Sequence, residues 1–228
     1  MDRERLAGMT LLELVVVLAL VGIMMAFGAS QVSSWSKDQR AATSARSVAD
    51  AFSLARAEAI RTGRNHMVAF RVETGLSGIS SDIVIVNDGP TCSTTGCSNC
   101  KIASTEIVHS VALERDVRFG SDPSQANGTA APNDGGNSGH RLLGSSFQDA
   151  NTASLGAASW VMFGPDGLPR RFTENSTTAA PCTQLGPVGQ ATGGIYVTNG
   201  SRDYAVVLSP LGTVRLHRWK KGIGGWTQ

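Results

Sequence analysis

The chain has 228 residues, and its 20 Lys and Arg against 18 Asp and Glu give a formal net charge of +2. Aromatic residues are scarce (6%) and glycines are numerous (26), which favours a loop-rich β domain over a large α/β enzyme. The length suits one domain of ordinary size plus an anchoring segment, and the total charge indicates no class of partner.

The strongest feature of the sequence is an apolar run close to its beginning. Residues 14–29 carry no charged or strongly polar side chain, and Leu11 and Leu12 bring the run to the lower limit for crossing a membrane. Glu13 interrupts it, and a carboxylate among apolar residues costs on the order of several kcal/mol unless paired, so it indicates function. A secretory signal peptide fits poorly, because the leader's charges cancel and no small-residue cleavage site follows. A plain anchor explains the length but not Glu13.

After Ser30 the pattern becomes amphipathic. Apolar residues recur at spacings of three and four, as on one face of a helix: Ala41, Ala45, Val48, Phe52, Ala55 and Ala59. No proline occurs before Pro90, and Gly63 is a suitable end. We therefore predict one helix over residues 9–62, with two separate helices as the alternative. Its first half would lie in a membrane or filament core, and its second half would pack on the following domain.

Beyond residue 63, short apolar and β-branched runs alternate with turn signals. The predicted strands cover residues 66–73 (half-buried), 83–86, 107–113, 116–119, 160–163, 169–172, 194–198, 203–209 and 213–219. Asn199-Gly200 between two of these runs is a strong hairpin signal. Residues 120–158 are dominated by small and polar side chains and predict a long, mobile and exposed loop.

The junction before the apolar run, Gly8-Met9-Thr10-Leu11-Leu12-Glu13-Leu14, resembles that of type IV pilins and pseudopilins. The resemblance implies that a prepilin peptidase cuts after Gly8 and that Met9 is then N-methylated. It also implies that Glu13 meets the terminal amine of a neighbouring subunit, which would turn two costly charges into one pair. Phe is more common in the family where Met9 stands.

Two later segments extend this resemblance. Trp160 to Gly167 and Tyr204 to Arg215 look like the GspH/FimT-type minor pilin domain, a β-sandwich on a long N-terminal helix. The implied fold is α+β: a long N-terminal helix, membrane-spanning in its first half and amphipathic in its second, packed on a C-terminal antiparallel β-sheet or sandwich. The implied domains are a leader (1–8), a pilin helix (9–62, with 9–30 transmembrane or in the filament core) and a β domain (63–228).

The resemblance implies a minor pilin or pseudopilin that assembles into or primes a pilus, at or near its tip, with the β domain exposed. The expected partners are other pilin subunits, the prepilin peptidase and the inner membrane before assembly. The expected location is a single pass through the inner membrane with a periplasmic or extracellular domain, and then the pilus or pseudopilus. Two alternatives remain open: a DNA-binding minor pilin for DNA uptake, and a type II secretion pseudopilin.

Four cysteines lie beyond the apolar run: Cys92, Cys97, Cys100 and Cys182. Their spacing also matches [2Fe–2S] ligands, and it could hold zinc. A pilin-like domain lies in an oxidising compartment, however, which favours two disulfides. Sequence permits three connectivities, of which we favour Cys92–Cys97 with Cys100–Cys182.

No catalytic motif is present. The four histidines are scattered, and no zinc-protease, nucleophile-elbow, phosphate-loop or dinucleotide motif occurs. We therefore expect no enzyme activity, no cofactor and no metal site.

The C-terminal part is locally basic. Candidate DNA-binding residues are Arg215, Arg218, Trp219, Lys220 and Lys221, since cations neutralise phosphates and an exposed Trp can stack on a base. The FimT-like resemblance implies a Gly-Arg-x-Arg stretch here, of which Arg215 is present while Thr213 replaces the first arginine. The alternative is an ordinary strand in which one face is buried and the other, with Arg215, His217 and Trp219, is solvated.

Overall fold

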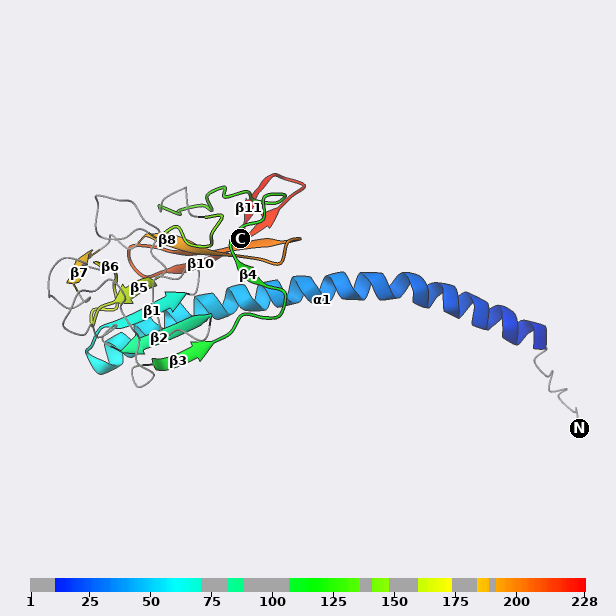
Figure 1. Cartoon of the computed structure of the whole chain (residues 1–228), viewed down its shortest axis with the longest axis horizontal. Coiled ribbons are helices and arrows are strands. Elements are labelled where there is room, and N and C mark those ends of the chain that lie inside the picture. Colours follow the sequence, from blue (N-terminus) through cyan, green and yellow to red (C-terminus); the bar gives the residue numbers. More distant parts are fainter. Residues whose placement is uncertain are drawn as a thin grey trace, which may run out of the picture. The chain divides into compact units, whose positions relative to one another are not determined.

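Helix α1 runs from Leu11 to Thr62, a length of 52 residues (Figure 1). It contains no proline, and it ends where Gly63 takes a left-handed φ of 67° and donates its N–H to the Ala59 carbonyl (3.1 Å). Glycine adopts this conformation without the steric cost of a Cβ, so it terminates helices well. The predicted helix end at Gly63 is confirmed.

The structure is a computed structural model. It describes residues 11–70, 82–87, 107–135, 141–147, 160–173, 184–188 and 192–228. The chain divides into two compact units, residues 1–39 and residues 40–228. Each unit is described by itself below.

The prediction that α1 contains a membrane-spanning segment is wrong. Among the described residues, no helix is both long and apolar enough to cross a membrane. A crossing needs about 17–25 consecutive apolar residues, and Glu13 and Ser30 confine the uninterrupted run to the sixteen residues between 14 and 29. The membrane-spanning part of the predicted fold class and the single-pass inner-membrane location are corrected with it.

Residues 40–228 form two antiparallel sheets (Figure 1). The first sheet has the order β3-β2-β1-β5-β6-β7, with β1 (His66–Phe70), β2 (Ile83–Asn87), β3 (Ile107–Val111), β5 (Trp160–Phe163), β6 (Pro169–Thr173) and β7 (Gln184–Val188). The second sheet has the order β11-β10-β9-β8-β4, with β4 (Arg118–Phe119), β8 (Gly193–Thr198), β9 (Asp203–Leu208), β10 (Val214–Lys220) and β11 (Gly225–Thr227).

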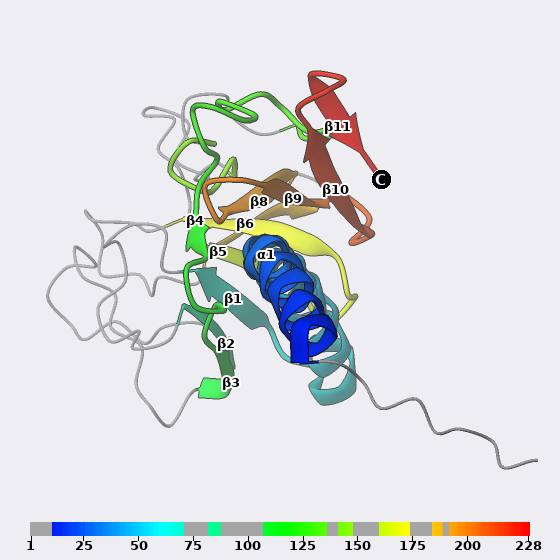
Figure 2. The same cartoon turned by 90° about the vertical axis from the view of Figure 1, so that its right-hand side faces the viewer.

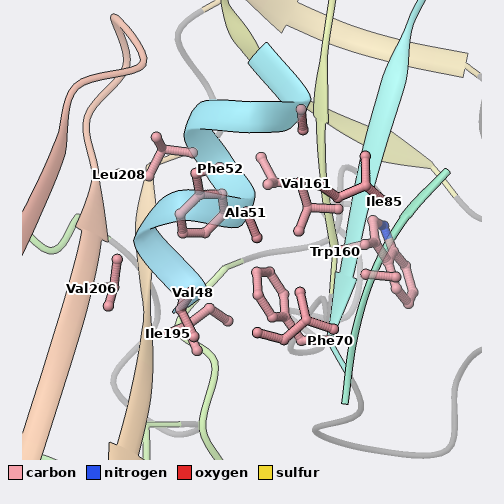
Figure 3. Close-up of a cluster of buried hydrophobic side chains, with 14 of the residues drawn as sticks. Val48, Ala51, Phe52, Phe70, Ile85, Trp160, Val161, Ile195, Val206 and Leu208 are labelled. Carbon is pink, nitrogen blue, oxygen red and sulfur yellow. The ribbon is translucent and has the colours of Figure 1, made fainter. Parts of the chain in front are cut away.

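The amphipathic part of α1 lies between the two sheets, as Figures 2 and 3 show. All six positions of its predicted apolar face are fully buried. Phe52 is at the centre, and its ring packs edge-to-face on three other phenylalanine rings. The distances between ring centroids are 5.4 Å to Phe70, 6.0 Å to Phe147 and 6.4 Å to Phe163. The predicted arrangement, a helix packed on a sandwich, is therefore corrected, because helix side chains fill the space between the sheets.

Burial also departs from prediction in β1. Its alternation predicts a half-buried strand, yet all five residues from His66 to Phe70 are buried. The strand lies in the middle of the sheet, between β2 and β5, and its alternate residues Met67 and Ala69 join the same apolar cluster as Val68. A central strand buried on both faces needs apolar residues at successive positions, which β1 has.

The predicted loop at residues 120–158 is not loose in its described parts. Residues 120–135 and 141–147, called the covering segment below, contain Ser121, Ala126, Ala131, Arg141 and Phe147, all at most 5% exposed. The covering segment bonds to β8, since the Ser146 N–H donates to the Gly194 carbonyl (2.9 Å) and the Tyr196 N–H donates to the Gly144 carbonyl (2.8 Å). The expected exposure is therefore wrong for the buried residues of this segment.

Candidate interaction surfaces

The first surface is the apolar N-terminal part of α1. The successive residues Val15, Val16, Val17 and Leu18 are each 50–61% exposed. Because successive helix residues are about 100° apart, four in a row point to every side of the helix. Residues 11–25 are all exposed, up to 81% for Leu11. A helix that is apolar on every side is normally buried, yet this segment is exposed.

Glu13 lies in the first turn of this helix. A carboxylate there is favourably placed, because the first turn presents unpaired backbone N–H groups and the positive end of the helix dipole. The predicted cleavage and methylation residues Gly8 and Met9 lie outside the described residues. So do all four predicted disulfide cysteines, Cys92, Cys97, Cys100 and Cys182.

The second surface consists of exposed cations along β10, with Arg215 on the outer face of the strand and Arg218 and Lys220 on the opposite face. Arg215, Arg218 and Lys220 on β10 and Lys221 just after it are all exposed. None of the four side chains forms an ion pair or hydrogen bond with another described residue. Hydrogen bonds from Ser124 lower the pKa of Asp122, and the charges of Arg118 and then Lys221 add to this effect. Four of the five predicted DNA-contact residues are thus accessible cations.

Trp219 is the exception among these five residues. Its side chain is only 8% exposed, and its ring packs edge-to-face on Trp226 of β11 (5.4 Å). Trp226 in turn contacts Tyr196 (5.7 Å) and donates its indole N–H to the Thr129 carbonyl (3.0 Å). Trp219 is therefore buried and not exposed, as the predicted stacking on a base requires, while Trp226 beside it is half-buried.

His217 occupies the same outer face of β10, opposite Ala205 of β9. It is 1% exposed, and neither ring nitrogen has a hydrogen-bond partner in the described part of the chain. Burial, and then the positive charge of Arg215, lower the pKa of His217 below its ordinary value of 6.5. The alternative of an ordinary strand put His217 on its solvated face, and the burial of His217 corrects this placement, because alternation alone does not show which face is covered.

The covering segment is held on this face by a buried polar cluster that sequence analysis missed. Asp134, whose side chain is 0% exposed, accepts hydrogen bonds from Arg141 Nε (2.7 Å), the Tyr196 hydroxyl (2.5 Å) and the Ser146 hydroxyl (2.6 Å). Burial, followed by the charge of Asp134, raises the pKa of Tyr196. The Tyr196 hydroxyl also accepts the Ala131 N–H (3.1 Å). The cluster joins the two described parts of the covering segment to β8.

Within the described ranges, no group of three or more His, Cys, Asp or Glu side chains could hold a metal ion. Of the other histidines, His66 is buried in β1 and His109 is exposed on the edge strand β3. The described residues thus present two exposed features, the apolar N-terminal part of α1 and the cations of β10. No family model, no curated protein and no solved structure matches this chain.

Proposed function

We propose that this chain is a filament subunit of the minor pilin or pseudopilin kind, in which the apolar segment of α1 packs against the same segment of neighbouring subunits. The exposure of residues 11–25 on every side of the helix carries the proposal. The β domain would remain on the outside of such a filament, at or near its tip.

The energetics support association. Twelve Leu, Val, Ile and Met side chains in this segment are 39–81% exposed. Fully burying such a side chain stabilises by about 1.5–3 kcal/mol, so completing their partial burial is worth on the order of 10 kcal/mol. Association costs about 4–15 kcal/mol. A helix surrounded by several others recovers this cost, whereas a single contact on one side would not.

Processing gives the first test. We expect a prepilin peptidase, added to the full chain in mild detergent, to cut between Gly8 and Met9, as intact-mass spectrometry would show. A Gly8→Asp variant should remain uncut, and Gly222→Asp is the matched control because that glycine is exposed and a Cβ there meets nothing within 4 Å. An uncut wild-type chain would count against the pilin assignment.

Assembly gives the second test. After detergent removal, the processed chain with its partner pilins should form filaments visible by electron microscopy, and Leu18→Lys should abolish them. Ala57→Lys, which places the same charge on an exposed position of α1 within the second unit, should leave them intact. Filaments that tolerate Leu18→Lys would refute the proposed packing.

The exposed cations favour a second function, DNA binding by the basic end of β10. Four side chains that each neutralise a phosphate predict a log–log salt slope of about −3.6 on duplex DNA. Affinity should therefore fall about 150-fold between 50 and 200 mM salt. The double variant Arg215→Glu with Lys220→Glu should remove most of this binding, whereas Arg46→Glu, an exposed arginine of α1, should not. Binding that is insensitive to salt or to the double variant would exclude this function.

A further inference from the structure

A hollow of about 330 Å³ opens beside the turn between β9 and β10. Ser209, Leu211 and Thr213 of the turn line it, together with Arg215 of β10, Val207 of β9 and Asn133 of the covering segment. The volume is at the small end of the range for ligand pockets, large enough for one or two amino-acid residues.

The turn that forms one wall is held in a defined conformation. Ser209 Oγ accepts the Thr213 N–H (3.0 Å), and the Gly212 N–H donates to the Ser209 carbonyl (2.9 Å). Arg56 of α1 donates to the Gly212 carbonyl (3.2 Å). Because the wall is already built, a ligand would not have to order it, which lowers the entropic cost of binding.

The polar groups around the hollow suit an anion. The Arg215 guanidinium makes no ion pair within the described residues. The Ser209 and Thr213 hydroxyls and the Asn133 amide add donors, and no carboxylate is among the lining residues. A guanidinium with neighbouring donors matches a carboxylate or a phosphate.

The apolar groups distinguish these two anions. Val207 is 1% exposed and Leu211 is 70% exposed, so aliphatic surface lines the hollow both at depth and at the rim. No aromatic side chain lines it, and base stacking needs one. A carboxylate directly attached to an aliphatic group uses both kinds of surface, as a polypeptide C-terminus with an aliphatic last residue does.

We propose that this hollow binds the C-terminal end of a partner polypeptide. Its carboxylate would pair with Arg215, and its last, aliphatic side chain would contact Val207 and Leu211. This site does not depend on filament assembly, so its test is independent of the processing and assembly tests, and it shares only Arg215 with the proposed DNA contact.

The probe is the dipeptide acetyl-Ala-Leu with a free carboxylate, titrated into the full chain in mild detergent while the methyl NMR signals of Val207 and Leu211 are followed. We expect saturable shifts of both signals. The amidated dipeptide, which keeps the side chain and lacks the charge, should bind about 10-fold more weakly or worse. Equal binding of the two peptides, or no saturable shift with either, would overturn the proposal.

Variants locate the contact. Arg215→Gln should abolish the preference for the free carboxylate, whereas Arg218→Gln, an exposed arginine of the same strand outside the hollow, should preserve it. Preference retained in Arg215→Gln would overturn the proposed pairing. Thymidine 5′-monophosphate is the third probe. If this nucleotide shifts the Val207 and Leu211 methyl signals with a lower dissociation constant than the dipeptide does, the hollow is a phosphate site and the peptide proposal is wrong.

Discussion

Replacing Asp134 with asparagine should release the covering segment from the second sheet. The Asp134 side chain is fully buried, and its carboxylate is bonded to Arg141, Tyr196 and Ser146 at 2.5–2.7 Å. Asparagine keeps the shape but leaves the guanidinium of Arg141, only 7% exposed, against a neutral amide. Breaking a buried ion pair in this way costs about 3–5 kcal/mol.

Amide hydrogen exchange measures this loss at a chosen position. The Ala131 N–H donates to the Tyr196 hydroxyl (3.1 Å), so it exchanges only when the covering segment lifts from β8. A loss of about 3–5 kcal/mol should accelerate its exchange by about two to three and a half orders of magnitude. NMR of the full chain in mild detergent resolves this single amide.

The control is the same substitution in an exposed ion pair. Asp116, which faces Arg40 at 3.4 Å and whose side chain is 56% exposed, should tolerate Asp116→Asn with a change under about 1 kcal/mol. Adding Arg141→Leu to Asp134→Asn should restore part of the protection, because it removes the unpaired buried guanidinium while the asparagine still accepts hydrogen bonds. Exchange at Ala131 that stays within twofold of wild type in Asp134→Asn would refute the reasoning.

Three further predictions concern stability, measured by thermal and denaturant unfolding. Phe52→Ala should lower the free energy of unfolding by about 3–5 kcal/mol, because it leaves a cavity between the sheets. The exposed control Ser53→Ala should change it little, and equal effects of the two variants would contradict the central position of Phe52 in the core. Gly212→Ala should cost about 1–3 kcal/mol, because φ is 79° and a Cβ would lie 3.2 Å from the Gly167 carbonyl oxygen; a neutral result would refute the strain. His217 has a lowered pKa, so the unfolded chain protonates first and stability should decline as pH falls below about 6.5. The decline between about pH 7.5 and pH 5 should be smaller in His217→Leu, and an unchanged decline would exclude His217 as its cause.

Sequence patterns correctly predicted the elements that are specified by residues close together in the sequence. The helix face with Val48 and Phe52 is buried as its spacing indicated. Apolar residues three and four positions apart lie on the same side of a helix, so the sequence pattern identifies the side that packs against the core. The hairpin predicted at Asn199-Gly200 joins β8 and β9, through a connection that spans residues 199–202, and Gly200 takes a positive φ (82°) there. Both signals lie within a few residues of the structure that they specify.

Features that depend on distant residues were not predictable in this way. The covering segment reads as a loop because its composition is polar, yet Asp134 and Arg141 are buried together against Tyr196, far along the chain. The short strands β7 and β11 were also missed. A three-residue strand such as β11 has too few residues to show alternation, and it forms because Trp226 packs on Trp219.

The position of α1 between the sheets has a consequence for the order of folding. Arg56 bonds to the Gly212 carbonyl, 156 residues later in the chain, and Phe52 shares one apolar cluster with Leu208. The ribosome therefore completes the helix long before it makes the strands that cover one of its sides. Contacts this far apart in sequence slow folding, because a large loop must close before they form. Until β9 and β10 have emerged, the nascent chain exposes part of its own core, and chaperones have their longest opportunity to bind it during that interval.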